Sequence, residues 1–209
     1  MKITVLGATG RIGTLAVREG LARGWHVTAV VRDPARLPVP SHPNLDVAVH
    51  TLDDPALASA LQNRDAVVLA LGARDRKPTT VNADGARAVV NALRGSDTRF
   101  VAVSAAGLKT EGDGFVTRFM VKPLLGVFLR NGFADLLVME SVIKDSDVAW
   151  TIVRPPRLTD GPATGRVLAN AAGPVRGSFS ISRADVAAFL LDAADGTGLV
   201  RSTVAIARR

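Results

Sequence analysis

Cysteine and tyrosine are both absent from the 209 residues of this chain. Without cysteine, the protein cannot form disulfides, use a thiol nucleophile or hold a metal through thiolates. Its three histidines, His26, His42 and His50, are scattered along the first 50 residues, so we predict no histidine-rich metal site. The missing tyrosine removes the phenol from the general acids that are available for proton transfer.

Long apolar runs are also absent, and none approaches the roughly 20 residues of a membrane-spanning helix. The opening "MKITVLGATG" has a short apolar stretch that leads at once into a glycine turn, unlike a secretory signal peptide. With 47% hydrophobic and 22% charged residues, the composition is typical of a globular protein. We therefore expect a cytoplasmic protein whose residues 1–209 form a single domain.

The net charge of +7 is carried mostly by arginine and has two interpretations. One is a polyanionic partner, and the other is an arginine-rich, solvated surface. No block of five or more Lys or Arg occurs, and aromatic residues make up only 4%, so we do not expect nucleic-acid binding. A small ligand that carries phosphates would use the positive charge equally well.

Apolar runs alternate with helical stretches along the chain. The predicted strands are 3–7, 26–31, 45–50, 65–71, 99–104, 148–153 and 202–206. The predicted helices are 11–23, 55–62, 80–94, 133–145 and 183–194. Several strands are continuously apolar, as in parallel sheets that are buried on both faces. This alternation predicts an α/β fold with a doubly wound parallel sheet, that is, a Rossmann-like fold.

Local signals mark two helix starts and two irregular regions. Ser182 and Asp185 form an S-x-x-D capping box, and an acid precedes Pro55 as in a first helical turn. Residues 105–132 and 155–178 are rich in glycine or proline. Because both follow strands, we expect them to be substrate-side loops, although 115–133 is equally compatible with an amphipathic helix on the core.

Three glycines follow the first predicted strand in "VLGATGRIGTLAV" and lead into a helix. Gly7 allows a tight turn, Gly10 allows the backbone to approach a pyrophosphate, and Gly13 allows close packing of the helix on the strand. The start of the helix offers unpaired N–H groups to phosphates, with Thr9 and Arg11 placed to assist. We infer a dinucleotide site.

The stretch "VVRDPARL" decides between two dinucleotides. Arg32 lies 19 residues beyond Gly13, close to the spacing of about 20 at which the ribose is recognised. An acid there accepts hydrogen bonds from a 2′-hydroxyl, whereas arginine binds a 2′-phosphate. Arg36 lies one helical turn beyond Arg32, and Asp33 before Pro34 suits a helix cap. We therefore predict NADP(H) over NAD(H), with a merely solvated Arg32 as the alternative.

The motifs together resemble a known group of proteins. "GATGRIG", "VVRDPARL", "LGARDRKPTTVNADGARAVVNAL", "RPPRLTDGPATG" and "ISRADVAAFLL" are similar to the atypical short-chain dehydrogenases. The nearest resemblance is to the NADPH-dependent flavin reductase/biliverdin-IXβ reductase family within the NmrA-like group. It implies a Rossmann-like domain that binds NADPH beneath a shallow site for flavins, quinones or tetrapyrroles.

The resemblance also implies the cofactor contacts, with Asp53 facing the adenine and Ser104 and Ala105 near the nicotinamide. The full set is Gly7, Thr9, Gly10, Arg11, Ile12, Gly13, Arg32, Arg36, Asp53, Leu71, Gly72, Arg74, Ser104, Ala105 and Pro155. Two positions depart from the family. Its Thr-Ser pair reads Ser104-Ala105 here, and Arg157 replaces a histidine, and both changes count against a tetrapyrrole substrate.

Carbonyl-reducing short-chain dehydrogenases use a Tyr-x-x-x-Lys pair, which this chain cannot form. Hydride transfer to a flavin or quinone needs no strong protein acid, because the acceptor delocalises the charge. Ser104 and Arg157 are the candidate catalytic residues, and Lys109 is a second candidate for stabilising the developing anion. The leading hypothesis is an NADPH-dependent reductase of such a small-molecule acceptor.

Two other functions stay open. One is an NmrA-like sensor that binds NADP(H) without turnover and transmits redox state to a partner. The other is a carbonyl reductase with Lys109, Lys122 or Lys144 as base, although none of these lies in a recognisable motif. We expect a monomer or a weak homo-oligomer.

Overall fold

Eight strands form a mostly parallel sheet in the computed structural model, which describes residues 1–73, 77–107 and 122–209. The strand order is β3-β2-β1-β4-β5-β6-β10-β8. These strands are β1 (Lys2–Leu6), β2 (His26–Val31), β3 (Leu45–Val49), β4 (Ala66–Leu69), β5 (Arg99–Val103), β6 (Ala149–Arg154), β8 (Val167–Asn170) and β10 (Ser202–Arg208). Only β8 runs antiparallel to its neighbour, β10. The order reverses between β1 and β4, which makes this the topological switch point and confirms the doubly wound sheet.

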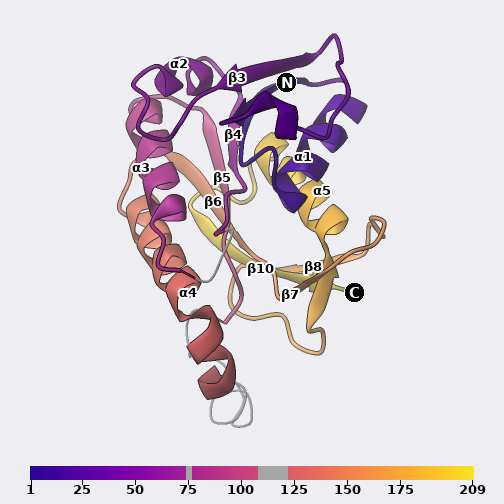
Figure 1. Cartoon of the computed structure of the whole chain (residues 1–209). Helices are drawn as coiled ribbons and strands as arrows, with labels where there is room; N and C mark the ends of the chain where they lie inside the picture. Colours follow the sequence, from indigo (N-terminus) through magenta and orange to yellow (C-terminus); the bar gives the residue numbers. More distant parts are fainter. Residues whose placement is uncertain (74–76, 108–121) are drawn as a thin grey trace.

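Helices cover both faces of the sheet (Figure 1). They are α1 (Arg11–Ala22), α2 (Leu57–Leu61), α3 (Val81–Leu93), α4 (Lys122–Lys144) and α5 (Arg183–Asp195). One buried cluster joins α1 and α5 to the sheet, and a second joins α2, α3 and α4 to its other face. The four residues of β4 are fully buried between these layers, which explains why the strand is continuously apolar.

The helix over 133–145 was predicted too short, because α4 begins at Lys122. Part of the predicted substrate-side loop 105–132 is therefore helical, and residues 108–121 lie outside the described residues. Pro123 and the nearby glycines suggested a loop, but proline is compatible with the first turn of a helix, where its missing N–H has no intrahelical partner.

The second predicted loop, 155–178, contains short strands that the sequence did not indicate. Within it lie β7 (Arg157–Thr159) and β8, and β7 pairs in parallel with β9 (Ser180–Ser182). Both β7 and β8 are held by partners distant in the sequence, since β8 pairs with β10 at the edge of the main sheet. Pairing of this kind leaves little trace in a segment rich in proline and glycine.

The predicted Ser182 cap of α5 is confirmed, the reciprocal contact of Asp185 is made with the Ser182 hydroxyl, and Asp185 has a further role. Ser182 accepts a hydrogen bond from the Asp185 N–H at 2.9 Å, and its hydroxyl donates to the Asp185 carboxylate at 2.8 Å. The same buried carboxylate accepts the N–H groups of Thr164, at 2.7 Å, and Gly165, at 3.0 Å. Burial by itself raises the pKa of Asp185, but these hydrogen bonds lower it below its usual value. Asp185 thus joins α5 to the segment before β8.

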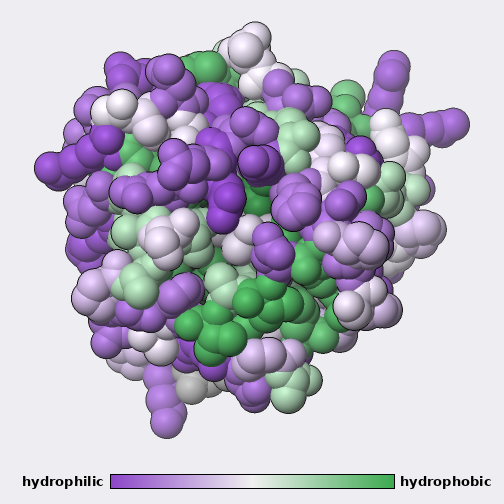
Figure 2. Space-filling model, turned by 90° about the horizontal axis from the view of Figure 1, so that it is seen from above, coloured by the Kyte–Doolittle hydropathy of each residue, from purple (hydrophilic) through white to green (hydrophobic). Residues whose placement is uncertain are grey.

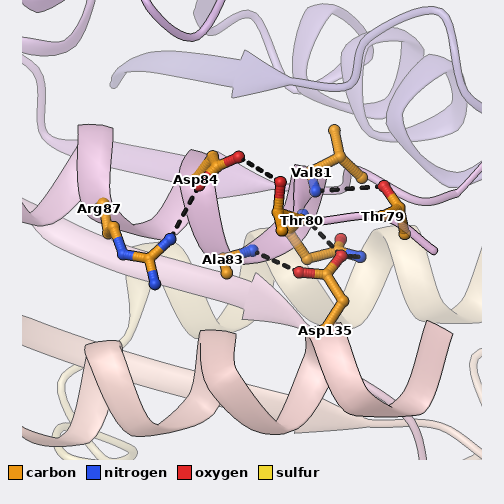
Figure 3. A network of polar contacts seen from close by, with 8 residues as sticks. Thr79, Thr80, Val81, Ala83, Asp84, Arg87 and Asp135 are labelled. Atoms are coloured by element: carbon orange, nitrogen blue, oxygen red, sulfur yellow. Dashed lines mark hydrogen bonds and ion pairs between the residues drawn. The ribbon is translucent and has the colours of Figure 1, made fainter. Parts of the chain in front are cut away.

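Another buried carboxylate, that of Asp135 on α4, caps the start of α3 (Figure 3). It accepts the backbone N–H groups of Asn82, at 3.0 Å, and Ala83, at 2.9 Å, and the side-chain amide of Asn82 at 2.8 Å. Nearby, Asp84 accepts a hydrogen bond from the Thr80 hydroxyl and pairs with Arg87 at the surface. Asp135 therefore satisfies buried N–H groups that α3 cannot satisfy itself.

Hydrophilic side chains cover most of the face seen from above in Figure 2, with hydrophobic side chains gathered below its centre. In the described part of the chain, no helix is both long enough and apolar enough to cross a membrane.

We expect Asp135→Ala to lower the free energy of unfolding by about 2–4 kcal/mol, because it leaves buried N–H groups without an acceptor. Urea unfolding of the purified variant measures the change. Asp84→Ala is the matched control, since it removes a carboxylate from the exposed side of the same helix start and should cost no more than about 0.5 kcal/mol. Equal losses in the two variants would contradict the capping role.

Candidate cofactor and acceptor site

The predicted cofactor residues follow the carboxyl ends of six neighbouring strands. Because β1 to β6 are parallel, these ends meet at one edge of the sheet. Gly7 to Gly13 follow β1, Arg32 and Arg36 follow β2, and Asp53 follows β3. Leu71 and Gly72 follow β4, Ser104 and Ala105 follow β5, and Pro155 follows β6. Arg74 and Lys109 lie outside the described residues.

Two of the three motif glycines are required by close backbone contacts. Gly7 has φ +82°, and a Cβ on it would lie 2.5 Å from the carbonyl oxygen of Ala70 at the end of β4. A Cβ on Gly13 would lie 2.1 Å from the Gly7 oxygen. The roles expected of Gly7, a tight turn, and of Gly13, close helix packing, are therefore seen directly. The position of Gly10, whose N–H donates to the Gly7 oxygen at 2.8 Å, completes the turn.

The first turn of α1 is open to an anion. Gly10 is its N-cap residue and provides no side chain, and the turn contains no acidic residue. The first bond of the helix runs from the Thr14 N–H to the Gly10 carbonyl at 2.8 Å, so the N–H groups of Arg11, Ile12 and Gly13 have no partner within it. Unpaired N–H groups and the positive end of the helix dipole together favour a phosphate here.

An aspartate that the sequence did not single out neighbours this turn. Asp160 forms an ion pair with Arg11 and another with Arg183 at 2.7 Å. The side chains of Arg11 and Asp160 are 62% and 70% exposed, so this contact contributes little to stability, and Arg11 can exchange it for another anion. Thr9 lies half-buried in the same turn.

Asp33 caps a short 3-10 helix, η1 (Pro34–Arg36), as its sequence context predicted. Its carboxylate accepts the Ala35 N–H at 3.0 Å. Arg32 and Arg36 stand on either side of this turn and are exposed. After β3, Asp53 is exposed as well, and a hydrogen bond from the Thr51 side chain is the main reason that its pKa lies below the usual value. The acid in "VVRDPARL" is thus engaged locally, while both arginines face solvent.

At the far half of the site, Glu140 of α4 joins β5 to β6. Glu140 is 2% exposed, and its carboxylate accepts hydrogen bonds from the Ser104 hydroxyl at 2.7 Å, Lys144 Nζ at 2.8 Å and Arg154 Nε at 2.7 Å. Arg154 also donates from Nη2, so its guanidinium is held by a two-point contact. The Ser104 proton that was a candidate for catalysis is therefore directed to Glu140 in this structure.

The position of Glu140 in the sequence carries one signal of its burial. It stands beside Met139 and before Ile143, both fully buried, so a charged residue occupies the apolar face of the helix. Burial by itself raises the pKa of Glu140, but hydrogen bonds from Arg154, Lys144 and Ser104 outweigh it and lower the pKa below its usual value. The carboxylate stays ionised because two cations and a hydroxyl surround it.

A hollow of about 460 Å³ adjoins this cluster, and Arg154 forms part of its wall. It lies where Ala106 and Gly107 follow β5 and Pro156 follows β6. Pro155 is buried beside it and accepts the Ala106 N–H at 2.8 Å. Arg157, a predicted catalytic residue, begins β7, is exposed and does not line the hollow. Among the described residues, no three His, Asp or Glu side chains are grouped as metal ligands.

We expect Glu140→Gln to destabilise the protein by about 3–5 kcal/mol at pH 7, because two partly buried cations lose their counter-charge. The folded-state pKa of Glu140 lies below that of an unfolded glutamate, about 4.3, so its charge stabilises the fold above that pH. This stabilisation is lost as the pH falls through the folded-state pKa. Urea unfolding from pH 7 to pH 3 should therefore show the gap to wild type narrowing below about pH 4, whereas a constant gap would refute the assignment.

The chain has relatives and the fold has counterparts among known proteins. The uncharacterized protein YwnB of Bacillus subtilis is 29% identical over 204 residues, which cover 92% of this chain and 91% of YwnB. A Streptococcus pneumoniae structure described as a candidate NADH-flavin reductase is 21% identical, with a TM-score of 0.80 and full coverage of both chains. A wide-type short-chain dehydrogenase/reductase of Veillonella parvula, solved with NADP, is 22% identical, with a TM-score of 0.77 over 99% and 94% of the two chains.

At these identities the structural matches show the fold, which is the Rossmann-like fold predicted from the sequence. The family match goes further, because a profile described as NAD(P)H-binding covers residues 7–197, from the first glycine of the motif to just beyond α5. It includes every residue of the strand edge described above. The chain therefore belongs to the NAD(P)H-binding family.

Proposed function

We propose that this protein is an NADPH-dependent reductase of flavin- or quinone-like acceptors. The observation that carries the proposal is the open first turn of α1, which presents three N–H groups above a glycine turn at the switch point of the sheet. This arrangement suits a pyrophosphate. The description of the Streptococcus pneumoniae neighbour as a candidate NADH-flavin reductase supports the reaction class.

The preference for NADPH rests on the charges after β2. The Asp33 carboxylate accepts a hydrogen bond from the Ala35 N–H, so it is not directed at a ribose hydroxyl. Arg32 and Arg36 are exposed nearby, and each charge-assisted bond to a 2′-phosphate contributes about 1.5–3 kcal/mol. The Veillonella parvula neighbour, which was solved with NADP, is consistent with this assignment.

The chain's own residues would divide the work along the strand edge. Gly10 to Gly13 would hold the pyrophosphate with Thr9 and Arg11, Asp53 would face the adenine, and Leu71 and Gly72 would line the groove. Ser104, Ala105 and Pro155 would border the nicotinamide. When bound, NADPH supplies a hydride from C4 of its nicotinamide. Because the Ser104 proton goes to Glu140, we propose that the protein contributes positioning and that solvent protonates the product.

Steady-state oxidation of NADPH by the purified protein tests this function. We expect turnover with at least one of FMN, riboflavin or menadione, read as the loss of NADPH absorbance above a protein-free control. Tight NADP binding without turnover on any of these acceptors would refute the reductase proposal and favour an NmrA-like sensor.

The cofactor preference can be tested by binding alone. Arg32→Ala combined with Arg36→Ala should raise the NADPH dissociation constant at least tenfold and leave that for NADH nearly unchanged, because only NADPH carries the 2′-phosphate. Arg94→Ala is the matched control. Arg94 is an exposed arginine that follows α3, and it is not among the residues that follow the carboxyl ends of the strands. Equal losses for the two cofactors would refute the clamp.

A further inference from the structure

The hollow beside Arg154 has the size and lining of a site for a flat apolar ring. Its volume of about 460 Å³ lies in the range of small-molecule sites. Among the described residues, the wall is made mostly of small apolar side chains, with Arg154 as the one charged side chain. The described lining residues are Ala106, Gly107, Arg154, Pro156, Ala171, Ala172, Gly173, Pro174, Val175, Ser178, Thr203, Ala205, Ile206 and Ala207.

The arrangement of the sheet places this hollow beside the predicted nicotinamide position. Ala106 and Gly107 directly follow Ser104 and Ala105, and the next wall is Arg154 at the end of the neighbouring strand β6. The floor is β10, where Thr203, Ala205 and Ala207 alternate and so share one face of the strand. Val204, between Thr203 and Ala205, belongs to the buried cluster that includes α5, and Ile206 belongs to that cluster and also borders the hollow.

The guanidinium of Arg154 is held in place by two of its nitrogens, and its third nitrogen, Nη1, is available as a donor. Its Nε and Nη2 are held by the two oxygens of Glu140. None of the hydrogen bonds in the described part of the chain uses its Nη1, and its side chain is 18% exposed. Because Lys144 pairs with the same carboxylate, the cluster has two cations for one anion. The cluster therefore carries one excess positive charge, and Arg154 is its member at the wall of the hollow.

We propose that this hollow is the acceptor site and that Arg154, through Nη1, donates a hydrogen bond to a ring carbonyl oxygen of the acceptor. The inference rests on the proposed function and deepens it by naming the acceptor class: a planar ring whose carbonyl oxygen becomes anionic on reduction. Glu140 is then a positioning residue, because it orients Arg154 without touching the acceptor.

The chemistry favours a cation at this place. A hydride, with its two electrons, leaves C4 of the nicotinamide, so NADPH is oxidised to NADP⁺ and a quinone becomes the hydroquinone monoanion. Water then supplies one proton to complete the hydroquinone. A flavin gains the same hydride, and the resulting negative charge is shared with a ring carbonyl. A fixed guanidinium stabilises such an anion and needs no reorganisation.

The sequence favoured Arg157 for this role, and the structure points to Arg154 instead. Arg157 is exposed on β7 and lies outside the lining of the hollow, whereas Arg154 is anchored at two points and faces it. Serving as the anion stabiliser requires a charge whose position is fixed before the reaction. The Glu140 contact provides this for Arg154.

Riboflavin and menadione binding to protein saturated with NADP⁺ tests the site without needing turnover. Riboflavin fluorescence and the quenching of tryptophan fluorescence by menadione report the two acceptors. Ala172→Phe should fill the hollow and raise the dissociation constant of each bound acceptor at least fivefold. Ala163→Phe is the matched control, since Ala163 is also exposed, lies in the same segment and does not line the hollow, and it should leave both constants unchanged.

Arg154→Lys keeps the charge but loses the two-point contact. It should therefore raise the dissociation constant of each acceptor that wild type binds at least tenfold, while the NADPH dissociation constant stays within twofold. Absence of riboflavin and menadione binding in wild type would overturn the inference. So would acceptor binding that Ala172→Phe and Arg154→Lys leave unchanged, even if the enzyme turns over. Conversely, acceptor binding that both variants weaken, in a protein that does not oxidise NADPH, would uphold the site and refute only the proposed reaction.

Discussion

The close approach of Gly13 to the carbonyl of Gly7 is the contact on which the cofactor edge depends. A Cβ on Gly13 would lie 2.1 Å from that oxygen, and one on Gly7 would lie 2.5 Å from the Ala70 oxygen. These contacts bring the start of α1 against the ends of β1 and β4, where the strand order reverses. The N–H groups of the first turn consequently open onto the one place in a doubly wound sheet where the chain leaves a crevice. The opening of this first turn toward the crevice follows from the backbone packing.

The starts of α1 and α3 differ in whether a carboxylate accepts hydrogen bonds from their free N–H groups. At α3, the buried carboxylate of Asp135 takes up the free N–H groups and supplies a negative charge to the positive end of the helix dipole. At α1, Gly10 supplies no side chain, and the first turn has no acid. An anionic ligand near the switch point therefore finds an open helix start at α1 and a closed one at α3. This difference favours the glycine turn over the start of α3 as a phosphate site.

The second half of the site depends on a single buried charge. Glu140 connects α4 to the ends of β5 and β6 through Ser104 and Arg154, and Lys144 supplies a further cation. Removing this carboxylate would leave its partly buried cationic partners without a counter-charge, which is strongly destabilising. In the proposed reaction, this arrangement would let a chain without tyrosine act on a reducible ring. Arg154 would offer a fixed cation to the developing charge in place of an acid, which suits an acceptor that delocalises the charge.

The sequence by itself determined the alternating fold, the glycine turn, the Asp33 cap and the Ser182 cap. Each of these depends on contacts within a few residues or on a regular period, so the pattern is legible locally. Tertiary structure alone decided the partners of Asp135, Glu140 and Asp160, which lie 53, 36 and 149 residues from Asn82, Ser104 and Arg11. It also decided β8, which exists because β10 offers an edge, and the start of α4 at Lys122. The exchange of Arg157 for Arg154 as the proposed anchor has the same origin. Both arginines look alike in "RPPRL", and only the position of Glu140 on a distant helix fixes one of them against the hollow.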